Sequence, residues 1–251
     1  MIKFFRKIRQ KLLSEGKTGK YLKYAIGEII LVVVGILIAL QINTWNEEKK
    51  ERVQEQKYLN EIKENLESDL LQIENIRNTY QYISTKGDSI LVFIKDAKPK
   101  TTNYNKLWEN IIEFTYVPSF QSQKNGYNNL ISAGNINQIK NQKLLREIST
   151  HYSNVEHYNE LVRQTIYESS QWDIHPPIKD LMGKKEFLAD LGYDFQTTSI
   201  SEDDLSKNEK LISGLIYRKQ WMEVGLRVTK LWSDSTNNLI NIITNEINKK
   251  K

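Results

Sequence analysis

The 251-residue sequence contains no cysteine and is poor in both glycine and proline. The absence of cysteine excludes disulfide frameworks, thiolate zinc sites, iron–sulfur clusters and thiol nucleophiles. The eleven glycines and four prolines are about half the usual share, which is typical of long helices rather than of turn-rich β architectures. Because 39% of the residues are hydrophobic, the chain can still bury a core. The composition therefore predicts a folded, all-α protein.

Positive charge is concentrated at the N-terminus. The whole chain has a net charge of +5, but residues 1–24 contain eight basic side chains and one acid, a net charge of +7. The remaining residues therefore carry a net charge of −2. Apolar residues alternate with the basic ones at helical spacing, which favours an interfacial helix on anionic lipid headgroups, with a disordered basic tail as the alternative. The basic balance is thus a membrane signal and does not indicate nucleic acid as a partner.

An apolar segment follows the basic one. Residues 25–42 contain only two polar side chains, Glu28 and Gln41. As a helix these residues would be about 27 Å long, and a few flanking residues extend them to the roughly 30 Å hydrocarbon core of a bilayer. The run is longer than that of a signal peptide, and no small-x-small cleavage site follows it.

We therefore expect a single transmembrane helix over residues 25–45. Since positive charge stays on the cytoplasmic side, residues 1–24 are expected in the cytoplasm and residues 46–251 on the other side. For a bacterial inner membrane, that side is the periplasm.

Two features of the expected span are candidates for function. Gly27, Gly35 and Ala39 are separated by eight and four residues and so share one helix face, as in small-residue contacts between membrane helices. They predict a self-association face, with chance as the alternative. Glu28 is an acid within the span, which is by default a functional hypothesis. The alternative is that Glu28 reaches the headgroups or pairs with a nearby lysine, because it lies one turn from the cytoplasmic edge.

Three long helical segments are expected in residues 46–251. The first continues from the span and repeats apolar residues every seven positions, which is the pattern of a coiled-coil or bundle seam. Its seam positions are Leu59, Ile62, Leu66, Ile73, Ile76, Tyr80 and Ile83, with Asp69 as an interruption. The other two cover residues 141–172 and 204–248. The sequence therefore predicts an antiparallel helical bundle.

Glycine, proline and capping residues predict where helices begin and end. Gly87 and Asp88 predict a break, followed by a separate short helix at residues 89–97. Ser201, with Asp204 three residues later, resembles a capping box and is expected to open the last long helix. Shorter helical stretches are expected at residues 104–114, at residues 127–133 before Gly134, and around residues 187–191.

The sequence contains no pattern for catalysis, for a cofactor or for a metal. The glycines form neither a phosphate-binding loop nor a dinucleotide fingerprint, and there is no nucleophile elbow. His151 and His157 lie six residues apart, on different sides of a helix, so they cannot share a metal ion, and His175 before two prolines is expected in a loop. We therefore predict no enzyme activity, no cofactor and no metal site.

Aromatic residues leave one binding role open. Four of the five tryptophans are expected on helices of the bundle: Trp108, Trp172, Trp221 and Trp232. Core packing is the commoner fate of such residues, and an aromatic-lined pocket in the bundle is the alternative.

Two segments resemble a known family. Residues 4–47, FFRKIRQKLLSEGKTGKYLKYAIGEIILVVVGILIALQINTWNE, resemble the opening of an uncharacterised bacterial inner-membrane family. Residues 127–152, which include LISAGNINQIKNQKLLR, are similar to the central motif of that family. The resemblance implies one N-terminal span and a helical extracytoplasmic domain. It implies no activity, substrate or catalytic residue, because the family has none assigned.

These observations lead to one hypothesis and two alternatives. The first is a membrane-anchored helical interaction protein that self-associates through the span and the seam, and presents its bundle to an envelope partner. The expected partners are thus a second copy of the chain or another envelope protein. One alternative is a single-span subunit of an ion-driven envelope machine in which Glu28 takes part in proton transfer. The other is a periplasmic bundle that senses a ligand.

Overall fold

The computed structural model describes residues 6, 10–11, 14, 18–96, 104–162, 164, 174–193 and 198–249. Within these ranges the regular elements are helices and there is no strand, so the predicted all-α fold is confirmed. The chain divides into two compact units, Met1–Gln56 and Lys57–Lys251. Helix α2 (Thr18–Asp96) contributes residues to both units. Most of the basic segment lies outside the described residues, including its predicted contact with headgroups.

The second unit contains helices of very different lengths. After α2 the chain forms α3 (Tyr104–Thr115), α4 (Asn125–Ser132), the 3-10 turn η1 (Ile136–Gln138), α5 (Gln142–Val162), α7 (His175–Met182), α8 (Lys185–Asp190), α9 (Glu202–Leu205) and α10 (Glu209–Lys249). The short helices predicted at residues 104–114, 127–133 and 187–191 are confirmed as α3, α4 and α8. Helix α5 confirms the start of the helix predicted at residues 141–172, whose last part lies outside the described residues.

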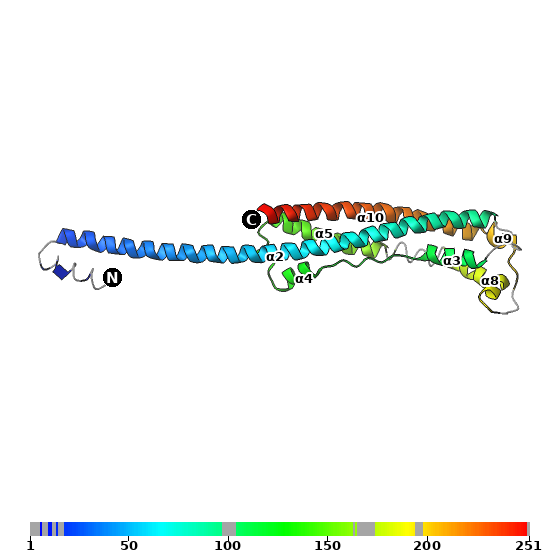
Figure 1. Ribbon diagram of the computed structural model, residues 1–251, viewed down its shortest axis with the longest axis horizontal. Coiled ribbons are helices and arrows are strands. Elements are labelled where there is room, and N and C mark those ends of the chain that lie inside the picture. The colour runs from blue at the N-terminus through cyan, green and yellow to red at the C-terminus, as the bar shows by residue number, and fades with distance from the viewer. Residues whose placement is uncertain are drawn as a thin grey trace. The chain divides into compact units, whose positions relative to one another are not determined.

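Three long helices, α2, α5 and α10, surround the core of this unit (Figure 1). Helix α10 runs antiparallel to α2, because Leu59 clusters with Ile243 at one end and Ile90 clusters with Leu211 at the other. Helix α5 runs parallel to α2, since its first turns join the Leu59 cluster and its later residue Val155 packs in the middle of the bundle. The predicted bundle is therefore confirmed, with one antiparallel helix among the three long ones.

The connector between α3 and α4 explains why α5 can run parallel to α2. Helix α3 packs beside the end of α2, where Leu107 joins the cluster of Ile90. Helix α4 packs at the opposite end of the bundle, where Leu130 joins the cluster of Leu59. Residues 116–124 join these two helices in an extended path, which Figure 1 shows running along the bundle. The chain thus returns to the start of the bundle before α5 begins.

The predicted break at Gly87 and Asp88 is wrong, because α2 continues through both residues. A glycine inside a helix costs only about 1 kcal/mol relative to alanine. The two turns that follow bury Ile90 and Ile94 completely, and burial of such a side chain is worth roughly 1.5–3 kcal/mol. Packing therefore outweighs the local preference. Glycine also suits the position because a Cβ there would collide with the ring of Phe114.

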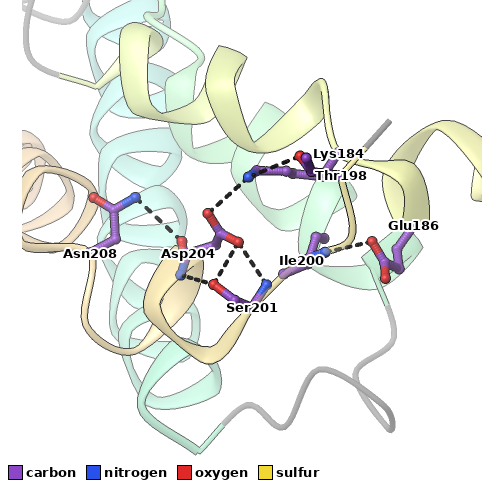
Figure 2. Close-up of polar contacts among 7 residues, drawn as sticks. All are labelled: Lys184, Glu186, Thr198, Ile200, Ser201, Asp204 and Asn208. Carbon is purple, nitrogen blue, oxygen red and sulfur yellow. Dashed lines mark hydrogen bonds and ion pairs between the residues drawn. The ribbon is translucent and has the colours of Figure 1, made fainter. Parts of the chain in front are cut away.

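The capping box at Ser201 is confirmed, but it opens a different helix from the one predicted. Ser201 N and Oγ donate to Asp204 Oδ2 at 2.6 and 2.8 Å, and Asp204 N donates to Ser201 Oγ at 3.3 Å. Figure 2 shows these hydrogen bonds as dashed lines. This box opens α9, which has four residues. Helix α10 begins separately, where Asn208 Oδ1 accepts a hydrogen bond from Leu211 N at 3.0 Å. One continuous helix from residue 204 is thus wrong, because a second N-cap restarts the helix.

The prediction that His175 lies in a loop is also wrong. His175 is the first residue of α7, and Pro176 and Pro177 occupy the first turn. Proline is favoured in the first turn because the backbone N–H groups there have no partner inside the helix. Burial lowers the pKa of the His175 imidazole, and the positive charge of Arg218 acts in the same direction.

Candidate functional site

The apolar part of α2 is not covered by the rest of the described chain. Residues 29–53 are all exposed, with exposed fractions of 62% for Ile36 and 57% for Leu37. Among the described residues, α2 is the one helix long and apolar enough to cross a membrane, and none of its most apolar stretch is buried. The core helix of a soluble domain would hide at least one face. Length, composition and exposure are together those of a helix that could span a bilayer.

The candidate residues of the span lie within this exposed stretch or next to it. A Cβ at Gly27 or Gly35 would meet nothing within 4 Å, and Ala39 is exposed, so this face of α2 is open. Glu28 follows Gly27 and is half-buried. Self-association through the glycine face and a functional role of Glu28 both stay predictions, since each concerns a second molecule or a proton path.

The seam residues lie in the core of the second unit. The exposed fraction is 8% or less for each of them: Leu59, Ile62, Leu66, Ile73, Ile76, Tyr80 and Ile83. Their neighbours belong to α3, α4, α5, α7 and α10 of the same chain. The seam therefore has no free face for a second copy. The seam residues thus pack within one chain, in place of the hypothesised association of two chains through the seam.

Asp69, which interrupts the seam, holds the connector between α3 and α4. Its carboxylate accepts hydrogen bonds from Ser122 Oγ at 2.5 Å and from Gln123 N at 2.7 Å. One turn earlier on α2, Asn65 Oδ1 accepts a hydrogen bond from Gly126 N at 2.9 Å. Burial raises the pKa of Asp69 above its ordinary value, against the opposing effect of its own hydrogen bonds. The polar interruption of the seam thus fixes residues 122–126 on α2.

Arg218 of α10 holds the other end of the same connector. It is only 2% exposed, and it donates to the carbonyl oxygens of Phe114, Thr115 and Tyr116 at 3.4, 3.3 and 2.9 Å. A cation at the C-terminus of α3 is favourable because the last carbonyl groups of a helix carry partial negative charge. Burial lowers the pKa of Arg218 to about 10, so the guanidinium stays charged at neutral pH.

A partly open cavity of about 340 Å³ lies between α2, α5, α10 and the connector. It is lined by Ile76 and Tyr80 of α2, residues 117–120 of the connector, Asn159 and Val162 of α5, and Gly225, Val228, Thr229 and Trp232 of α10. None of these side chains is charged at neutral pH. The volume lies at the lower end of the range of about 300–1,000 Å³ that is typical of small-molecule sites.

Three aromatic residues, Tyr80, Phe120 and Trp232, form part of the cavity wall. The ring centroids of Phe120 and Trp232 are 4.7 Å apart, and Tyr158 lies edge-on to Trp232 at 5.6 Å. Trp232 is 6% exposed, and its Nε1 has no hydrogen-bond acceptor among the residues described, so packing holds its ring. Gly225 allows α10 to approach the opposite wall, because a Cβ there would lie 2.9 Å from the ring of Tyr80.

The tryptophans named in the sequence analysis lie in different surroundings. Trp232 lines the cavity, and Trp221 is partly buried against the core. Trp172 and the side chain of Trp108 lie outside the described residues. Sequence reasoning did not identify Tyr80, Phe120 or Gly225 as parts of a pocket. A glycine in the middle of a 41-residue helix was the available signal, because it marks a close approach.

The two histidines of α5 lie on different sides of the helix, as predicted. His151 is 7% exposed and His157 is exposed. Burial lowers the pKa of His151 to about 4, so its imidazole is neutral at pH 7. No group of three or more histidine, aspartate or glutamate side chains in the described ranges could hold a metal ion.

These features define the class of the protein. It is an all-α protein that combines a helix able to span a membrane with a helical bundle containing an apolar cavity. The chain belongs to the Family of unknown function (DUF6090), whose sequence profile matches residues 28–204. The predicted membership of an uncharacterised family is confirmed, while its bacterial and membrane details stay predictions. No curated protein and no solved structure matches the chain.

Proposed function

We propose that this protein is a single-span, membrane-anchored interaction module. In this proposal the apolar part of α2 crosses the bacterial inner membrane, and the bundle lies in the periplasm, where it binds another envelope protein and catalyses no reaction. One observation carries the proposal: the same helix, α2, contains both the exposed apolar stretch and one wall of the bundle core. A bundle built on such a helix is tied directly to its anchor.

The energetics of insertion support the anchor. Residues 25–42 contain twelve leucine, isoleucine and valine side chains. Each favours insertion by about 0.3–0.6 kcal/mol at the centre of a helix, whereas one charged residue there costs about 2.5–3.5 kcal/mol. The sum is favourable even with Glu28 inside the segment, because Glu28 lies near the edge of the span, where the cost is lower. The net charge of +7 before the segment supports a cytoplasmic N-terminus.

The absence of native cysteine allows a direct test of topology. Single reporters are introduced as Lys20→Cys before the apolar stretch and Asn238→Cys on the exposed face of α10. A membrane-impermeant maleimide, added to cells with a permeabilised outer membrane, is expected to label Asn238→Cys and to spare Lys20→Cys. The opposite labelling pattern, or equal labelling of both, contradicts the proposed orientation.

The anchor is tested by placing a charge in the apolar stretch. Leu37→Arg is expected to shift much of the protein out of the membrane fraction, because arginine at the centre of a span is costly. Leu71→Arg is the matched control: it makes the same change in the same helix at a position 69% exposed on the bundle, and it should leave the protein in the membrane. A Leu37→Arg variant that stays fully embedded contradicts the anchor.

The interaction role is tested by photocrosslinking in native membranes. A photoreactive phenylalanine derivative replaces Leu71 or Leu231, which are 69% and 66% exposed on the bundle. We expect a discrete adduct with a second protein from at least one position, and its loss when Leu37→Arg is combined with the probe. An adduct of two copies that disappears with Gly35→Leu assigns self-association to the glycine face. The absence of any adduct contradicts an interaction role.

A further inference from the structure

We propose that the cavity between α2, α5 and α10 is a binding site for an uncharged, flat aromatic molecule of about two rings. The cavity is formed within the second unit of the chain. The inference therefore goes beyond the proposed anchoring and interaction function and does not depend on it.

The wall of the cavity is fixed in place by two buried charged residues. Residues 117–120 line the cavity. Just before them, Arg218 binds the carbonyl oxygens of residues 114–116, and just after them Asp69 accepts hydrogen bonds from residues 122 and 123. A segment held at both ends cannot easily collapse into the space beside it. The two buried charges thus preorganise a cavity, and preorganisation lowers the cost of binding.

The size of the cavity sets the size of the ligand. Protein interiors are close-packed, and voids much larger than a water molecule are few. An engineered apolar cavity of about 150 Å³ is known to bind benzene. A cavity of about 340 Å³ is therefore large enough for about two rings.

The walls of the cavity select a flat, uncharged ligand. The rings of Tyr80, Phe120 and Trp232 offer edges and faces for stacked or edge-on contacts. Among the described residues that line the cavity no side chain is charged, so a charged ligand would lose its hydration without a partner from them. The hydroxyl of Thr229 is already bonded to the carbonyl oxygen of Gly225 at 2.8 Å. The Asn159 amide remains to orient one polar group of the ligand.

The test uses the full chain in lipid nanodiscs with 5-fluoroindole as the probe, followed by fluorine NMR. We expect the probe signal to broaden and shift beyond its behaviour with empty nanodiscs. Val228→Trp, which fills the cavity from α10, should weaken the affinity at least tenfold. Leu231→Trp is the matched control, because it adds the same ring to the same helix at a position that is 66% exposed, and it should bind like the native chain. Partition of the probe into lipid is common to all samples.

Two further measurements complete the test. The zwitterion 5-fluorotryptophan is expected to bind at least tenfold more weakly than 5-fluoroindole, and equal affinity overturns the preference for an uncharged ligand. Circular dichroism melts establish that each variant is folded; if Val228→Trp is not, Val162→Trp fills the cavity from the α5 wall instead. No broadening beyond empty nanodiscs, or equal binding by the native chain and a folded cavity-filling variant, overturns the site.

Discussion

The two parts of helix α2 contain the same apolar residue types in opposite surroundings. Leu37 is 57% exposed, whereas Leu66, eight turns further along the same helix, is fully buried. Residues 25–42 are apolar on every side, while the second part alternates a seam of apolar positions with polar faces. A helix with one apolar face can turn it toward partner helices and keep the other faces in water, but a helix apolar on all sides cannot. The polar positions therefore decide which part joins a core in water.

The largest expected difference between the two parts is in the free energy of unfolding, when the same leucine-to-alanine substitution is made in each part. Leu66→Ala should lower the free energy of unfolding of the bundle by about 2–5 kcal/mol, because it removes buried methyl groups and leaves a cavity. Leu37→Ala should leave that free energy unchanged. Denaturant unfolding of the detergent-solubilised chain, followed by circular dichroism, measures both. Equal losses in the two variants would mean that the apolar stretch belongs to the core of the bundle.

A second contrast between buried and exposed positions concerns the two histidines of α5. Folding lowers the pKa of His151 from 6.5 to about 4, so between these pH values the unfolded chain binds a proton that the folded chain does not. Stability contributed by this group is present above pH 6.5 and is lost as the pH falls toward 4. At about 1.36 kcal/mol per pKa unit, the loss reaches at most about 3 kcal/mol.

The measurement compares the free energy of unfolding at pH 7 and pH 4.5. His151→Gln should lose less stability between these pH values than the native chain. His157→Gln, at an exposed position, should behave like the native chain. Asp69, whose pKa is raised, titrates with the opposite effect on stability, but it is common to all three proteins and cancels in the comparison. Identical pH profiles for all three proteins would contradict the burial of His151.

The smallest expected effect comes from comparing one glycine in the bundle, Gly126, with one in the apolar stretch of α2, Gly35. Gly126→Ala should destabilise the bundle by about 1–3 kcal/mol, because the new Cβ would lie 2.9 Å from the backbone of residues 61 and 62. Gly35→Ala has open space around it and should leave the bundle unchanged. Gly183→Ala, which makes only ordinary contacts, is a control within the bundle. Thermal melts of the three variants give the comparison, and similar melting temperatures for all three would refute the close approach of α4 to α2.

Much of the fold could be predicted from periodicity and local capping. The predicted seam residues of α2 are all buried, and α10 likewise buries apolar residues such as Leu211, Leu239 and Ile243. The capping box of Ser201 and the positive φ of Gly134 also follow from local sequence. These features depend on residues only a few positions apart. The errors at Gly87 and at the start of α10 arose where distant packing or a second cap changed the outcome.

The candidate site could not be predicted to the same extent. Asp69 looked like an interruption of a seam, and Arg218 like one of many basic residues on a helix. Their partners lie 53 and about 100 positions away in the chain, in the connector and in the last residues of α3. A single sequence does not say which distant segments come into contact. It therefore gave no sign that residues 117–120 form the wall of a cavity.

The sequence by itself determined the helical class, the apolar stretch and the excess of positive charge before that stretch. Each of these depends on composition or on short-range periodicity. It also determined which face of α2 would be buried. Only the tertiary structure decided what buries that face: helices of the same chain cover the seam. The tertiary structure also decided that two buried charges hold a connector beside an open cavity. Burial and long-range hydrogen bonds depend on which distant segments meet, and that is a property of the folded chain.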